Sequence, residues 1–169
     1  MGKETVFTGR AVDKHMIVED HIEIDQSLLI DTNFLTVSSL ISSREHSVIY
    51  KGRFKGAPAA LKIIKPMNAL NVSPDHNDKI LREIMMLSRV KHENIEKFIG
   101  ATVHATFAIV MEFMKSGSLQ KYLFRIKPNG GLDLKLCRNF ALDISRAMEC
   151  LHRNGIIHRN LKPSNIHFC

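Results

Sequence analysis

The chain has 169 residues, 44% of them hydrophobic, which is enough for one ordinary domain or a large part of a bigger one. Lys and Arg exceed Asp and Glu by 24 to 17, a net charge of +7, but the basic residues are scattered, which argues against specific nucleic-acid binding. No apolar run is long enough for a membrane span, and Cys137, Cys150 and Cys169 show no pairing pattern. We therefore expect a soluble protein with reduced thiols, in the cytoplasm or the nucleus.

The first half of the chain predicts a small antiparallel sheet with one helix. Residues 1–34 show no sustained period, which predicts an N-terminal extension with weak structure. Three β-rich runs follow, at 35–41, 47–54 and 59–64, and they predict a meander. Residues 66–78 contain Asn, Ser and Pro, as expected of a loop. Ile80, Ile84 and Leu87 then recur at helical spacing, which predicts an amphipathic helix over 78–90.

The second half predicts two more strands and then helices. The strands are expected at 97–103 and 107–113, and a short helix should follow Ser118 and run to about residue 125. After a loop at 128–131, the longest helix is expected over 134–153, ended by Asn154 and Gly155. One face of that helix carries an apolar stripe of Leu136, Phe140, Ile144, Ala147 and Leu151. The fold class is therefore α+β, with a five-stranded antiparallel sheet followed by helices.

Residues 158–165 read His-Arg-Asn-Leu-Lys-Pro-Ser-Asn and match six of the seven fixed positions of the protein-kinase catalytic loop, H-R-D-L-K-P-x-N. A chance match is the alternative, but other motifs stand in the right order at 88–95, 98–101 and 139–144. Over residues 28–169 the chain resembles plant Raf-like kinases, a group of serine/threonine and dual-specificity enzymes. The resemblance implies an N-terminal extension at 1–34, a kinase N-lobe at 35–114 and a partial, helical C-lobe at 115–169.

The same resemblance implies a site for ATP and Mg²⁺. Lys62 matches the strand lysine that contacts the α and β phosphates, and Glu83 matches its helix partner. Met111 matches the gatekeeper at the back of the pocket. The remaining matches are the hinge residues Glu112 and Met114, and the apolar positions above the adenine ring, Ile41, Ile49 and Ala60. Each of these residues alone could equally be a surface charge or a plain strand residue.

Among the catalytic positions, the one that differs from the family is the proton-accepting base. By resemblance Lys162 would hold the transferring phosphate and Asn165 would bind Mg²⁺, but Asn160 stands where the family has the aspartate base. An amide cannot accept a proton at neutral pH, so we expect no phosphate transfer. The sequence also ends before an Asp-Phe-Gly segment, which adds to the expectation of an inactive fragment.

The sequence departs from the family on both sides of the expected nucleotide site, in the Gly-rich loop and at the position under the adenine. Ser42, Arg44 and Ser47 stand where a Gly-rich loop has glycines that let the backbone approach the phosphates. Arg44 could alternatively supply a substitute positive charge. His167 stands where the family has an apolar side chain under the adenine. We therefore expect ATP binding to be weak or absent.

Three readings of the function follow. The preferred one is an inactive, kinase-like chain that acts by binding protein partners, in part because the apolar stripe of the long helix should lie exposed without the later C-lobe helices. The second is part of an ATP-dependent serine/threonine kinase in MAP-kinase-type signalling. The third, nucleic-acid binding through the net charge, would require a strongly salt-dependent affinity.

Overall fold

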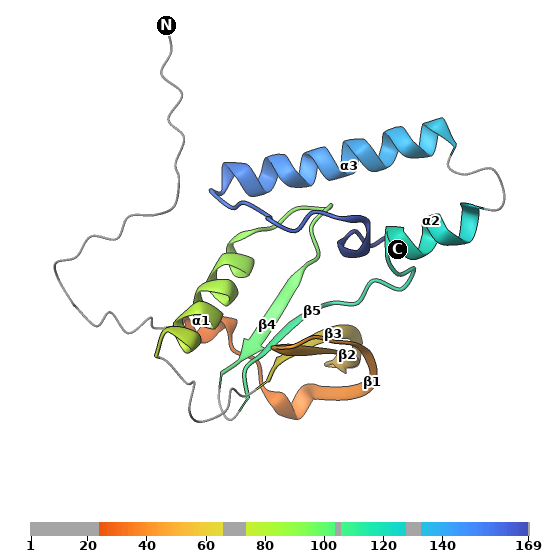
Figure 1. The fold of residues 1–169 in the computed structure, drawn as a ribbon. Helices are drawn as coiled ribbons and strands as arrows, with labels where there is room; N and C mark the ends of the chain where they lie inside the picture. The colour runs from red at the N-terminus through yellow and green to blue at the C-terminus, as the bar shows by residue number, and fades with distance from the viewer. Residues whose placement is uncertain (1–23, 66–73, 104–105, 128–132, 169) are drawn as a thin grey trace, which may run out of the picture.

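The computed structural model describes residues 24–65, 74–103, 106–127 and 133–168. Five strands form one antiparallel sheet in the order β1-β2-β3-β5-β4, with the helix α1 (Pro74–Arg89) beside it (Figure 1). The strands are β1 (Leu35–Ser43), β2 (Ser47–Phe54), β3 (Ala57–Ile64), β4 (Phe98–Thr102) and β5 (Ala108–Glu112). The predicted α+β class and five-stranded antiparallel sheet are confirmed.

The β2–β3 hairpin shows how the sequence sets the register. Lys55 and Gly56 both have positive φ, 49° and 80°, as the two central residues of a tight hairpin turn require. Phe54 therefore pairs with Ala57, and β3 begins two residues before the predicted position 59. On the neighbouring pair of strands, a Cβ at Gly52 would clash with the Thr36 carbonyl oxygen, so that position accepts only glycine.

The core lies between α1 and the sheet. Ile80 and Ile84 of α1 form a buried cluster with Ala101 of β4 and Ile109 of β5. A second cluster of Ala59, Leu61 and Val110 lies within the sheet strands β3 and β5. Because burying a large aliphatic side chain contributes about 1.5 to 3 kcal/mol, the first cluster holds α1 firmly at one position on the sheet.

Two predicted boundaries were wrong. The helix begins at Pro74 rather than residue 78, and proline suits a first helical turn, where its missing N–H has no partner to lose. Residues 24–34 were expected to be weakly structured, but they form two 3₁₀ turns, η1 (Gln26–Leu28) and η2 (Thr32–Phe34). The Ile30 N–H donates to the Ala101 carbonyl over 3.0 Å, and Ile24 packs against the α1 cluster. The rest of the predicted extension, residues 1–23, lies outside the described residues.

The second part of the chain holds α2 (Leu119–Ile126), α3 (Leu134–Arg153) and a 3₁₀ turn, η4 (Pro163–Asn165). Ser118 and Asp133 cap α2 and α3, each accepting a hydrogen bond from a backbone N–H of the first turn. The long helix ends as predicted, since Asn154 is its C-cap and Gly155 has φ of 70°. In Figure 1, α3 runs along one side of the molecule, and the segment after it returns toward α2.

The apolar stripe of α3 is less exposed than predicted. Leu136, Phe140, Ile144 and Leu151 are all partly buried. The Phe140 ring contacts Tyr122 of α2 and Phe168, with ring centroids 6.3 and 5.8 Å apart. The large side chains of α3 that do face solvent are Leu134, 83% exposed, and Leu142, 46% exposed. Residues outside α3 therefore contact the stripe at Phe140, although no residue of α3 is fully buried.

Candidate functional site

The clearest feature of the site is an ion pair between the sheet and α1. Lys62 lies two residues before the end of β3, and its Nζ is 2.6 Å from Oε1 of Glu83 on α1. Both side chains are about one third exposed, at 31% and 36%. The packing of Ile84 next to Glu83 holds α1 close enough for this contact. The pairing predicted from the sequence is therefore present.

Strand register gathers the predicted pocket walls around Lys62. Ile49 pairs with Lys62, and Ala60 pairs with Met111. Paired residues and residues two apart share one face of a sheet, so these four side chains line the same face. Ile41 lies on the edge strand β1 and is 48% exposed. Four predicted residues thus come together, and Ile41 stands at the open rim.

The hinge end of β5 is tied to β4. The Glu112 N–H donates to the Lys97 carbonyl over 3.0 Å, and Glu112 Oε1 accepts from the Lys97 N–H over 2.7 Å. The Lys51 ammonium lies 4.9 Å from the ring centroid of Phe113, and Met114 is partly buried. Glu112 is therefore held by its neighbour Lys97, which fixes where the chain leaves the sheet.

Glu96 is a feature that the sequence interpretation missed. Burial, together with the nearby charge of Glu112, raises the pKa of Glu96 to about 7. The signal that could have revealed it is a carboxylate two residues before the apolar start of β4. Two carboxyl groups therefore sit together near the hinge, one of them easily protonated.

The turn between β1 and β2 is bound to the end of β3. The Lys65 Nζ donates to the Arg44 carbonyl over 2.6 Å and to the Ser43 hydroxyl over 3.4 Å. Lys65 also donates its N–H to the His46 carbonyl, and the Arg44 N–H donates to Ser47. The sequence interpretation missed Lys65, which only the register of β3 brings to this turn. The Arg44 N–H is engaged within the turn, whereas a phosphate-binding loop offers such groups to its ligand.

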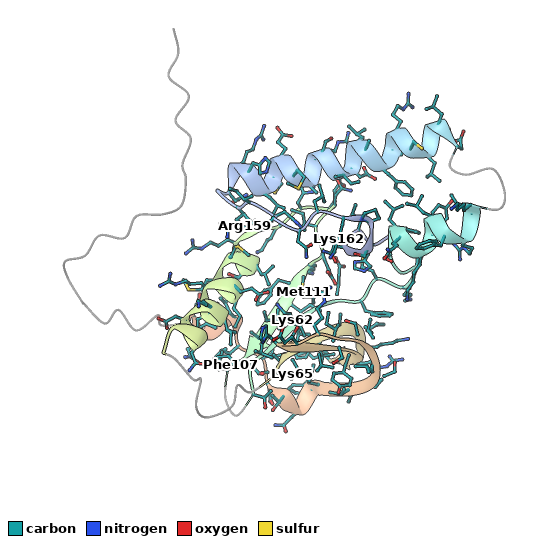
Figure 2. The ribbon with its side chains drawn as sticks, viewed as in Figure 1. Lys62, Lys65, Phe107, Met111, Arg159 and Lys162 are labelled. Atoms are coloured by element: carbon teal, nitrogen blue, oxygen red, sulfur yellow. The ribbon has the colours of Figure 1, made fainter. Side chains whose placement is uncertain are left out.

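The loop around Asn160 is closed by its own hydrogen bonds. The Asn160 N–H donates to Nδ1 of His158 over 3.2 Å, and the Asn165 amide donates to the Asn160 carbonyl over 2.9 Å. Arg159 has a positive φ of 60°. Asn160 and Lys162 are exposed, while Asn165 is partly buried. Figure 2 shows Arg159 and Lys162 on this segment, with Met111 and Lys62 on the sheet beside it.

His167 lies where the chain pairs with the segment after the hinge. It forms an isolated bridge with Ser118, and the neighbouring Ile166 carbonyl accepts from the Leu119 N–H over 2.8 Å. Burial, and to a lesser extent the charge of Lys121, lowers the pKa of His167. Both effects disfavour the charged imidazolium, which reduces the cost of placing the ring against an apolar ligand surface.

The described residues fit only part of an ATP–Mg²⁺ complex. Ile49, Ala60 and Met111 offer an apolar wall, and Lys62 offers a charge for phosphates. Asn165 donates through its nitrogen, so its oxygen stays available to a cation. Among the described residues no group of three or more His, Cys, Asp or Glu side chains could hold a metal. The adenine side of the site therefore fits better than its phosphate side.

The structure combines a five-stranded sheet, a strand lysine paired with a helix glutamate, and a loop with kinase spacing. Together these features define the front part of a phosphotransferase fold. The sequence pattern of the protein kinase domain matches residues 38–168, most of the chain. The chain belongs to the protein kinase family. No helix of the described part has the length and apolar character that crossing a membrane requires.

Individual relatives agree with this family. The chain is 35% identical over 138 residues to the serine/threonine/tyrosine-protein kinase HT1 of Arabidopsis thaliana, covering 80% of this chain and 35% of HT1. It is 34% identical over 138 residues to the Arabidopsis serine/threonine-protein kinase STY46, covering 81% of this chain and 23% of STY46. For the probable serine/threonine-protein kinase gdt2 of Dictyostelium discoideum the identity is 34% over 146 residues, 86% of this chain and 8% of gdt2.

The two Arabidopsis kinases are of the Raf-like type, so the resemblance stated from the sequence is confirmed. The chain spans between 8 and 35% of the length of these three relatives.

Proposed function

We propose that this chain is a Raf-like kinase segment that acts by binding and does not transfer phosphate. The observation that carries the proposal is Asn160 at the position of the catalytic base, in a structure that keeps the Lys62–Glu83 ion pair. The arrangement associated with an active kinase is thus combined with a group that cannot accept the substrate proton.

The chemistry of the loop supports this proposal. A positioned general base contributes about 10² to 10⁴ to a rate, and no other carboxylate occurs between His158 and Phe168. The Asn160 carbonyl is already bound by Asn165, which leaves only a side-chain amide to face a substrate hydroxyl. Asn160 can position such a hydroxyl by hydrogen bonding, but it cannot remove the proton.

Nucleotide binding is proposed to be weak. Lys65 holds the β1–β2 turn, and Ser42, Arg44 and Ser47 replace the glycines that would let a backbone approach phosphates. ATP would enter against Ile49, Ala60 and Met111, with Lys62 near its phosphates and Asn165 as a ligand for Mg²⁺. Protein partners in the cytoplasm or nucleus would then be the main ligands.

A second candidate function is serine/threonine phosphotransfer within a MAP-kinase-type pathway. Three features favour it: the 2.6 Å Lys62–Glu83 contact, Lys162 two residues after Asn160, and the Asn165 oxygen available to a cation. The assay that separates the two functions measures radiolabelled phosphate transfer from ATP with Mg²⁺. We expect the chain to match its own Lys62→Met variant, whereas Mg²⁺-dependent transfer that is lost in this variant would establish the second function.

A further inference from the structure

A hollow of about 290 Å³ lies outside the nucleotide site. It is formed by the outward face of α1 and by the turn that follows α3, and its lining consists of Arg82, Met85, Met86, Arg89, Asn154 and Ile156. In Figure 1, the end of α3 and the segment after it lie close to the last turn of α1. No step of the proposed function uses this hollow.

Helical geometry explains why these side chains face away from the core. Successive residues of an α-helix are rotated by about 100°, so Arg82, Met85, Met86 and Arg89 lie opposite the stripe of Ile80, Ile84 and Leu87. The stripe packs on the sheet, and Met86 on the opposite face is 38% exposed. A helix face that points to solvent is normally polar, so two methionines there indicate a contact that the described residues do not supply.

The charge of the hollow is positive and unbalanced. Arg82 and Arg89 are exposed, and neither has a hydrogen bond or ion pair within the described part of the chain. No carboxylate is among the lining residues, and the Asn154 amide donates to the Cys150 carbonyl. Guanidinium groups beside thioether walls suit a ligand that combines carboxylates with branched apolar side chains.

One segment of this chain has that composition. Residues 17–20 read Ile-Val-Glu-Asp, and this is the only place within residues 1–23 where two acidic residues are adjacent. The described chain starts at Ile24, which packs against the cluster containing Ile80 and Ile84 of α1. Seven extended residues span about 23 Å. Half the girth of a helix about 10 Å wide is roughly 16 Å, which the backbone from Ile24 to Ile17 and Val18 spans. Glu19 and Asp20 lie about 17 and 13 Å of extended chain from Ile24, and the length of the arginine side chains adds to their reach.

We propose that residues 17–20 of this chain dock in the hollow, with Glu19 and Asp20 against Arg82 and Arg89, and Ile17 and Val18 against the two methionines. The docked segment holds α1 from outside while the core stripe holds it from inside. Because Glu83 is on the same helix, the segment supports the position of α1 in which Glu83 meets Lys62.

The chain contains no tryptophan, so a single Val18→Trp substitution in the full chain gives a local probe. If the segment docks, the indole should emit at shorter wavelength and be quenched by acrylamide about threefold less than a free tryptophan. Arg82→Glu with Arg89→Glu should abolish this protection, and so should Glu19→Arg with Asp20→Arg. Combining all four substitutions should restore it, because each charge again has an opposite partner.

Lys79→Glu with Lys91→Glu is the matched control, since it makes the same change in net charge outside the hollow and should leave the probe protected. Circular dichroism of every variant checks that the fold is retained. The proposal is overturned if the indole of the Val18→Trp chain is quenched like free tryptophan. Protection that survives both charge reversals, or that rises with protein concentration because a second copy supplies the segment, also overturns it.

Discussion

Position 160 holds Asn where the kinase pattern has Asp. One carboxylate oxygen is thus replaced by an amide nitrogen, in a loop that otherwise keeps most of the pattern. The neighbours Lys162 and Asn165 are retained, and the backbone of the loop is closed by hydrogen bonds from Asn165 and to His158. The loop geometry therefore does not depend on the residue that catalysis needs. Under the proposed function, the change at position 160 removes the chemistry of the base without loss of the fold.

Loss of the Lys65 side chain should open the β1–β2 turn. Lys65→Met removes the hydrogen bonds to the Arg44 carbonyl and the Ser43 hydroxyl, while the backbone bond to His46 remains. We expect faster amide hydrogen exchange at Arg44 and a loss of stability below about 1.5 kcal/mol, since these bonds are exposed. Lys55→Met, at the opposite hairpin, is the matched control. Unchanged exchange at Arg44 would show that Lys65 does not hold the turn.

The raised pKa of Glu96 predicts that the free energy of unfolding depends on pH. Its pKa of about 7 in the fold lies above the ordinary value of 4.5, so the folded protein binds the extra proton between these pH values. The contribution of Glu96 is therefore favourable at low pH and is lost as the pH rises through about 7. Glu96→Gln should raise the free energy of unfolding at pH 8 by up to roughly 3 kcal/mol, at about 1.4 kcal/mol per pKa unit.

Urea unfolding of Glu96→Gln at pH 5 and pH 8 checks this prediction. The gain over the unmodified chain should be larger at pH 8 than at pH 5. The exposed neighbour Glu93 provides the control substitution, Glu93→Gln, which should change stability by less than about 0.5 kcal/mol at either pH. An equal effect of Glu96→Gln at both pH values would contradict the pKa assignment.

Among the elements, the β1–β2 hairpin is proposed to limit ATP binding. Reverting Ser42, Arg44 and Ser47 to glycine should tighten ATP binding, because a glycine backbone can turn toward the phosphates. The unmodified chain should gain only about 0.4 kcal/mol of stability when the ATP concentration equals Kd, and that concentration should lie in the millimolar range. Thermal melting with and without Mg²⁺–ATP measures the gain in stability and the ATP concentration at which it occurs. A clear thermal shift of the unmodified chain at micromolar ATP would contradict the proposed weak binding.

The helix α3 makes a different prediction at two of its apolar positions. Phe140 contacts Tyr122 and Phe168, so Phe140→Gln should destabilise the chain by about 1 to 3 kcal/mol. Leu142 is 46% exposed, and Leu142→Gln should reduce self-association while changing stability by less than about 0.5 kcal/mol. Urea unfolding and light scattering compare the two variants. Equal destabilisation by both would show that Leu142 is covered in solution.

Sequence periodicity predicted most elements because local and tertiary preferences agree in them. Ile80, Ile84 and Leu87 predict the helix that their burial against the sheet then stabilises. Residues 24–34 were misread because their apolar run, Leu28 to Ile30, is short and shows no sustained period. They are ordered by contacts with β4 that no local pattern shows. Lys65 and Glu96 escaped prediction for the same reason, since their partners become neighbours only through sheet register and burial. The roles of Asn160 and Lys62 came from resemblance and not from periodicity.

For the whole molecule, the sheet and α1 form the larger buried unit, because the fully buried large side chains Leu61, Ile84, Ile109 and Val110 all belong to it. The helices α2 and α3 contribute the buried Leu119 and a partly covered stripe. The Lys62–Glu83 pair lies inside the first unit, and Asn160 lies beyond the second. The fold can therefore keep the active arrangement of α1 regardless of what stands at position 160.

The most direct test of the central claim is single-turnover phosphate transfer from radiolabelled ATP, with protein in excess and millimolar Mg²⁺. The account predicts that the chain and its Lys62→Met variant give the same background, with Ser164→Ala as a control for changes in the loop. Transfer that requires Mg²⁺, persists in Ser164→Ala and disappears in Lys62→Met would show that Asn160 does not prevent catalysis, and would contradict the account.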